Sequence, residues 1–172
     1  MMPGVATRDS DGIRMSISTD SGALDAQPST NRRSSLQIGA PELRLLEGWA
    51  REDYPREACG LLLGRAGPEG TRVLHVRRAR NRNVERARDR FELDPLDHLA
   101  AEDEARDLGL AVVGVWHSHP DRPPRPSEAD RAGAWSGWSH LIVAVDARAS
   151  CSVRSWRIVV GAFVEETLDR TS

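Results

Sequence analysis

The segment that most restricts the fold of this chain is LGLAVVGVW, residues 108–116, because the sequence HSHP begins immediately after it. Such a run is far shorter than the roughly 20 residues that cross a bilayer. Its continuous apolar character is instead typical of a strand that is buried on both faces. The chain must therefore build a sheet around this strand, and two histidines lie where it ends.

The remaining apolar patterns predict further strands and helices around this central strand. Pro41 opens a helix that ends before Tyr54-Pro55, and FELDP leads into a second helix. Strands are predicted at 36–38, 57–65, 71–79, 110–118, 140–146, 152–160 and 162–168, and helices at 41–53, 95–108 and 127–135. Because strands and helices are mixed without strict alternation, we expect an α+β domain with a central mixed sheet flanked by helices.

Length and composition favour one domain with an N-terminal extension. The 172 residues suit a single core. Residues 1–35 are rich in Ser, Asp, Gly and Thr without periodicity, so we expect a flexible tail there and a domain over residues 36–168. The net charge of -2 argues against bulk nucleic-acid binding. Since the N-terminus lacks the apolar core of a secretory signal, we expect a cytoplasmic location and no membrane partner.

The segment HSHPDRPPRPSEAD, residues 117–130, concentrates groups that can bind a metal ion. In an extended strand, His117 and His119 project from the same face. Ser127 begins a helix that places Asp130 one turn inside it. Two imidazoles and one carboxylate suit a zinc ion with an open fourth position. A lone HxH is a weak signal, however, and Ser127 with Asp130 also fits a helix N-cap with an acidic N3 partner.

The joined pattern HxHP, six residues, then SxxD resembles the signature of the JAMM, or MPN+, metalloproteases. Upstream, EACGLLLG resembles the glutamate-bearing strand of the short prokaryotic members, and the similarity spans about residues 36–168. The resemblance implies a cytidine-deaminase-like/MPN fold and one Zn²⁺ per chain, with His117, His119 and Asp130 as ligands.

The same resemblance implies roles for two further residues. Glu57 would carry a proton from the attacking water to the departing amine, and the Ser127 hydroxyl would donate a hydrogen bond to the developing oxyanion. The structural alternative for Glu57 is an exposed carboxylate at the start of a strand. Among the other histidines, His75 and His98 are interpreted as structural, and a supporting role for His140 stays open.

For substrate, the resemblance implies hydrolysis after the Gly-Gly C-terminus of a ubiquitin-like sulfur-carrier protein, including release of cysteine from a carrier-cysteine adduct. We hypothesise that the extended tail adds to a sheet edge near the metal. Two rivals are a non-catalytic MPN scaffold, which would lose metal ligands, and a RadC-like DNA-repair-associated protein, which would lack the glutamate strand. The sequence does not identify the carrier. It also leaves open whether a peptide or an isopeptide bond is cleaved, and whether the protein forms a homodimer.

Two other features have several interpretations. The segment 77–90 carries seven arginines. We favour a solvated loop over a docking patch for an acidic carrier, and a nucleic-acid-binding patch is the least favoured interpretation. Cys59 and Cys151 form no CxxC pair and are expected to be buried thiols, although the sequence does not exclude pairing between chains.

Overall fold

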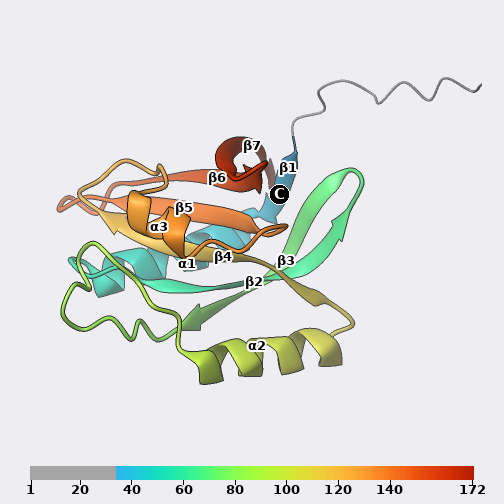
Figure 1. The fold of residues 1–172 in the computed structure, drawn as a ribbon, viewed down its shortest axis with the longest axis horizontal. Coiled ribbons are helices and arrows are strands. Elements are labelled where there is room, and N and C mark those ends of the chain that lie inside the picture. Colours follow the sequence, from blue (N-terminus) through green and yellow to red (C-terminus); the bar gives the residue numbers. More distant parts are fainter. Residues whose placement is uncertain (1–33) are drawn as a thin grey trace, which may run out of the picture. The chain divides into compact units, whose positions relative to one another are not determined.

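The computed structural model describes residues 34–172, so the tail predicted at 1–35 lies, up to residue 33, outside the described residues. The ordered elements form an α+β domain (Figure 1). In chain order they are β1 Ser35–Gly39, α1 Ala40–Asp53, β2 Cys59–Gly67, β3 Gly70–Ala79, α2 Pro95–Asp107, β4 Ala111–Pro120, α3 Glu128–Ala132, β5 Ser139–Val145, β6 Cys151–Val159 and β7 Ala162–Thr171.

Each predicted strand and helix is present, and the differences concern element ends. Helix α3 stops at Ala132, short of residue 135, because Gly133 occupies its C-cap. Strand β2 begins at Cys59, so Glu57 precedes the strand that was predicted to contain it. Strand β4 continues through Pro120, and both histidines of HSHP therefore lie within it.

The strands form one mixed sheet, as predicted, but the sheet closes on itself. Its order is β1-β3-β2-β4-β5-β6-β7, and β1 also pairs with β7. The parallel pairs are β1 with β3, β1 with β7, and β4 with β5. Closure depends on β1 bridging the two ends of the sheet, a long-range pairing that local sequence patterns do not encode.

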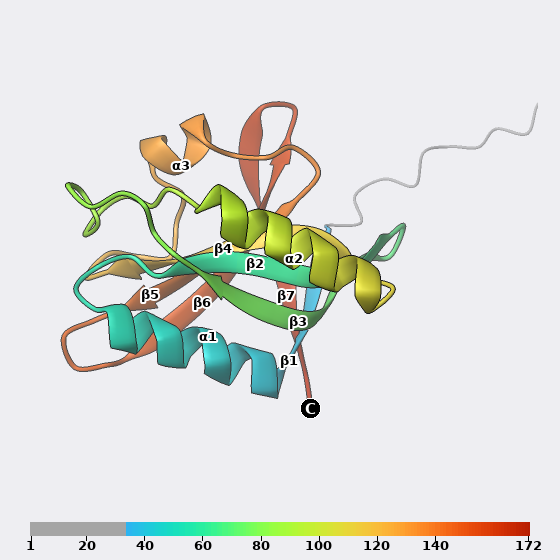
Figure 2. The same ribbon diagram turned by 90° about the horizontal axis from the view of Figure 1, so that it is seen from below.

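The two long helices cover opposite faces of the sheet around β2 and β3 (Figure 2). On the α1 side, Trp116 is fully buried and stacks on Trp49 with ring centroids 5.7 Å apart. On the α2 side, Leu61 and Leu63 pack against Ala101 and its neighbours. Strands β2 and β4 are thus buried on both faces, which confirms the interpretation of the apolar run before HSHP.

The arginine-rich segment is largely offset by acidic partners. Four of its seven arginines form ion pairs: Arg77 with Glu104, Arg78 with Glu52 and Asp53, Arg80 with Asp94 and Asp97, and Arg86 with Asp89. This pairing favours the solvated-loop interpretation, because little uncompensated charge is left for nucleic acid.

Neither cysteine is in a disulfide within the chain. Cys59 is buried, as predicted, and burial raises the pKa of its thiol to about 12. Cys151 is only partly buried at the start of β6, so the prediction of a buried thiol is wrong there. None of the helices in residues 34–172 is long and apolar enough to cross a membrane.

Candidate metal centre and active site

His117 and His119 lie side by side near the end of β4. Their Nε2 atoms are 3.0 Å apart, and both side chains are buried. They share a face because they are two residues apart in a strand. The residues between and before them face the other way: Trp116 packs under α1, and the Ser118 hydroxyl accepts a hydrogen bond from the Ala58 amide at 2.8 Å.

Asp130 meets both histidines from the first turn of α3. Its Oδ1 lies 3.2 Å from His117 Nε2, and its Oδ2 lies 3.4 Å from His119 Nε2. Tetrahedral ligands with bonds of about 2.0–2.1 Å to zinc stand roughly 3.3 Å apart, close to these separations. The two imidazoles and the carboxylate therefore fit a small divalent ion such as zinc.

The surroundings prepare the imidazoles to act as ligands. His119 Nδ1 is 2.9 Å from the Pro123 carbonyl, and a proton donated there leaves the lone pair on Nε2 facing the site. Phe91 stacks on His117 with centroids 4.5 Å apart. Burial lowers the pKa of His117 although Asp130 opposes the effect, which favours the neutral imidazole that metals bind.

Ser127 and Asp130 form the capping box expected from their spacing. The Ser127 amide donates to Asp130 Oδ2 at 2.6 Å, and the Asp130 amide donates to Ser127 Oγ at 3.2 Å. Burial alone would raise the pKa of Asp130, but the His117 and His119 rings beside it and the hydrogen bond from the Ser127 amide hold this pKa well below its ordinary value. The cap therefore fixes an ionised carboxylate in front of the two imidazoles.

Glu57 lies on the same face of the sheet as the histidines. Cys59 is opposite His117, so continuing the register by two residues places Glu57 opposite His119. Glu57 is only 2% exposed, which contradicts the alternative of an exposed strand-start carboxylate. Its Oε1 contacts the Arg122 guanidinium, while Oε2 is buried without a hydrogen-bond partner among the described residues. Burial raises the pKa of Glu57 to about 8, against the opposing effect of Arg122.

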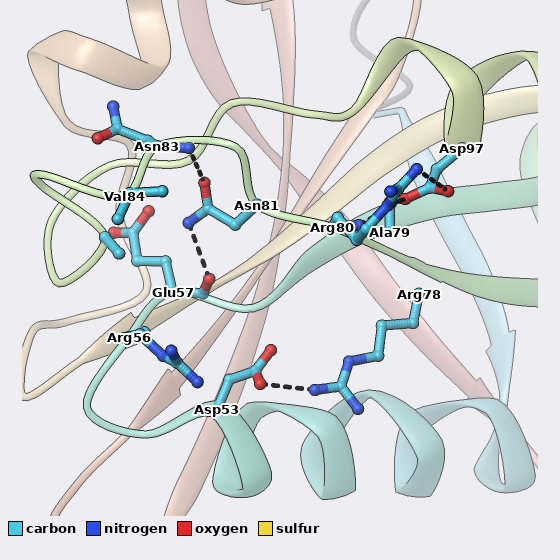
Figure 3. Close-up of a pocket in the computed structure, with 11 residues that line it drawn as sticks. Asp53, Arg56, Glu57, Arg78, Ala79, Arg80, Asn81, Asn83, Val84 and Asp97 are labelled. Carbon is cyan, nitrogen blue, oxygen red and sulfur yellow. Dashed lines mark hydrogen bonds and ion pairs between the residues drawn. The ribbon is translucent and has the colours of Figure 1, made fainter.

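Two residues that support Glu57 were not predicted from the sequence. Asn81 donates its side-chain amide to the Glu57 carbonyl and accepts a hydrogen bond from the Asn83 amide, which ties the arginine-rich loop to the glutamate (Figure 3). Arg122 reaches Glu57 from the proline-rich loop. In the sequence, Arg122 stands out only as a charged residue among the prolines that follow HSHP. Asn81 has no distinguishing feature beyond its place among arginines.

Two cavities flank this region. One, of about 540 Å³, starts at His117 and Asp130 and passes Phe91, Trp135 and His140. The other, of about 620 Å³, lies on the side shown in Figure 3, and its lining includes Arg56, Glu57 and Val84. The first cavity is lined by two of the three side chains that could hold a metal ion, so we call it the ligand groove.

Strand β4 is not a free edge, so the hypothesis that an extended tail adds to a sheet edge near the metal stays a prediction for other strands. Along Gly114–His117 this strand pairs with β2 on one side and β5 on the other. An extended tail therefore finds no free edge there to join. The ligand groove instead offers a tail access to His117 and Asp130.

The other three histidines occupy different places. His140 lines the ligand groove, lies 3.0 Å from the Trp135 carbonyl through Nε2, and has its pKa lowered by burial. His98 lines the groove from α2 and contacts Trp135 and Trp138. His75 is exposed on β3. None of the three joins the group of His117, His119 and Asp130.

Replacing Glu57 by Gln is expected to stabilise the metal-free protein at high pH. The unfolded carboxyl ionises near its ordinary pKa of 4.5, whereas the folded one keeps its proton until about pH 8. The wild type therefore loses stability as the pH rises between these values, at about 1.4 kcal/mol per pH unit. Urea unfolding of EDTA-treated proteins should show Glu57→Gln gaining on the wild type by several kcal/mol between pH 5 and pH 8.5. An equal difference at both pH values would contradict the burial argument.

The fold and the site together define a class: an α+β domain whose central strand presents two buried histidines to an aspartate on a capped helix. Residues 40–159 match the family model described as prokaryotic homologs of the JAB domain. The chain belongs to this Prok-JAB family, which confirms the resemblance to short prokaryotic JAMM proteins.

Individual relatives and a solved structure agree with this assignment. A CysO-cysteine peptidase from Mycobacterium tuberculosis is 33% identical over 135 residues, covering 78% of this chain and 90% of that protein. A desampylase from Haloferax volcanii is 32% identical over 120 residues, covering 67% of this chain and 84% of that protein. The solution structure of a protein from Desulfitobacterium hafniense has a TM-score of 0.69 at 28% identity, covering 79% of this chain and 92% of that one.

Proposed function

We propose that this chain is a zinc-dependent peptidase that hydrolyses the amide bond after the Gly-Gly C-terminus of a ubiquitin-like sulfur-carrier protein. The observation that carries the proposal is the convergence of His117, His119 and Asp130 beside a buried glutamate, one oxygen of which has no hydrogen-bond partner in the described part of the chain. The names of the relatives, CysO-cysteine peptidase and desampylase, point to the same class of reaction. We also propose that the fold is of the cytidine-deaminase-like/MPN type.

One Zn²⁺ would be held by His117, His119 and Asp130. Bound by such a set, zinc supplies a Lewis acid and lowers the pKa of a coordinated water to about 7. The metal-ligating positions are all present, which argues against a non-catalytic scaffold.

Glu57 is the proton carrier in this proposal. Its Oε2 accepts no hydrogen bond from residues 34–172, while Arg122 holds Oε1 in place. A carboxyl with a pKa raised by burial binds a proton firmly enough to take it from the nucleophile and releases it to the departing amine. A bound cation would lower this pKa toward neutrality, where both transfers are efficient.

Ser127 is the oxyanion donor in this proposal. Its oxygen accepts a hydrogen bond from the Asp130 amide, so its own hydroxyl proton stays available. Hydrogen bonds directed at developing charge are stronger in the transition state than in the ground state. The capping box thus orients a metal ligand and a catalytic hydroxyl together.

The test uses a carrier protein extended by one cysteine after Gly-Gly, incubated with the zinc-loaded full-length chain. Loss of the mass of one cysteine residue is the expected result. A matched carrier ending in Gly-Val-Cys is expected to stay intact, because the proposed specificity is for glycine next to the scissile bond. An unchanged mass for the Gly-Gly substrate with zinc bound would overturn the proposal.

The rival of the RadC type is tested by the same preparation. Binding to duplex DNA at physiological salt, together with an uncleaved carrier, would favour that DNA-repair-associated class. We expect neither result, since the arginine-rich segment is mostly paired with carboxylates.

A further inference from the structure

The hairpin that joins β6 to β7 has an unfavourable residue at its turn. Val159 pairs with Ala162, which leaves Val160 and Gly161 as a two-residue turn. Their φ angles are +49° and +75°, the positive signs that a type I′ turn requires at both positions. Asn-Gly is the preferred pair there, whereas a β-branched residue such as valine is strained at positive φ.

The same turn also exposes apolar side chains. The segment from Ile158 to Val164 reads IVVGAFV and contains no polar side chain. Val160 is 100% exposed, and the flanking Val159 and Val164 are 48% and 47% exposed. Because Val160 is strained and fully exposed, asparagine at this position would stabilise the fold better than valine does.

The hairpin stands next to the ligand groove. The Phe163 ring meets the His140 ring edge-on at 5.1 Å, and the Arg131 guanidinium lies 6.0 Å from the centre of the Phe163 ring. His140 lines the groove, and Arg131 follows the metal-ligating Asp130 in α3. Figure 2 shows the hairpin rising near α3, away from α1.

The size of the ligand groove limits which part of a substrate can enter it and which part must contact the neighbouring hairpin. About 540 Å³ accommodates a short extended tail but not a folded protein. The folded body of a carrier whose tail occupies the groove must therefore rest on the surrounding surface. The uncharged tip with its three exposed valines offers that body an apolar contact beside the groove.

We propose that the hairpin tip, Val159–Val164, is a docking contact for the folded body of the ubiquitin-like carrier. This inference rests on the proposed function and adds the surface by which the substrate is recognised. It makes Val160 a specificity residue that acts on substrate binding, separate from the groups that perform the chemistry.

The variant Val160→Asn tests this idea because asparagine suits the turn but removes the apolar contact. Relief of the strain should raise the melting temperature by a few degrees. On the carrier-Gly-Gly-Cys adduct, KM should rise about tenfold with kcat unchanged. On a short peptide with the same tail, kcat/KM should not change. Leu45→Gln is the control, since Leu45 is 49% exposed on α1, across the sheet from the hairpin.

Each other outcome is informative. A wild type that cleaves the adduct, with an unchanged KM for Val160→Asn, would overturn the docking contact and leave the proposed function standing. A wild type that cleaves neither substrate would overturn both. If sedimentation shows that the wild type is a dimer and that Val160→Asn is a monomer, the tip serves self-association. That result would overturn docking of the carrier.

Discussion

Glu57→Gln is expected to lower kcat on the carrier adduct by about 10²- to 10⁴-fold, the usual contribution of a positioned acid-base group. Glutamine matches the shape of the side chain and can still contact Arg122, but it cannot accept a proton. Glu57 is not one of the three proposed ligands, so zinc content should stay at one ion per chain. KM should change little, because the tail binds before protons move.

The matched control is Glu128→Gln, which removes a carboxylate whose side chain is 94% exposed on α3. This variant should keep wild-type kcat. Steady-state rates and metal analysis of the same preparations separate the two effects. A Glu57→Gln protein with full zinc occupancy and nearly wild-type kcat would show that the proton passes through another group.

His119→Ala is expected to abolish both zinc binding and cleavage. His119 is fully buried with its Nε2 near Asp130, so alanine would remove one of the three proposed ligands and leave two, which would hold zinc weakly. Ligands that bind only the folded state stabilise it by about 4 kcal/mol at 1,000 times Kd. Adding zinc should therefore raise the melting temperature of the EDTA-treated wild type and leave that of His119→Ala unchanged.

His75→Ala is the control for this variant, because His75 is exposed on β3. It should bind zinc and respond to it as the wild type does. Retention of one tightly bound zinc by His119→Ala would mean that the ion sits elsewhere. Inductively coupled plasma measurements after dialysis distinguish the two cases.

The parts of this molecule that local sequence predicts are those fixed by near neighbours. The spacing of His117 and His119 determines a shared face wherever a strand forms, and the Ser127–Asp130 spacing determines the cap. Two features depend on contacts between distant segments. One is closure of the sheet through β1, and the other is the contact of Glu57 with Asn81 at its carbonyl and with Arg122 at its carboxylate. No periodicity in the chain records those contacts, so the burial of the glutamate could not be derived.

The capping box of α3 has a consequence for how the centre assembles. A helix of five residues is too short to persist by its own hydrogen bonds, and its first turn depends on the two bonds between Ser127 and Asp130. The carboxylate that closes the turn is the one that would grip the cation. The same two bonds therefore hold both the start of the helix and the carboxylate, so binding of a cation at Asp130 would also favour an ordered α3.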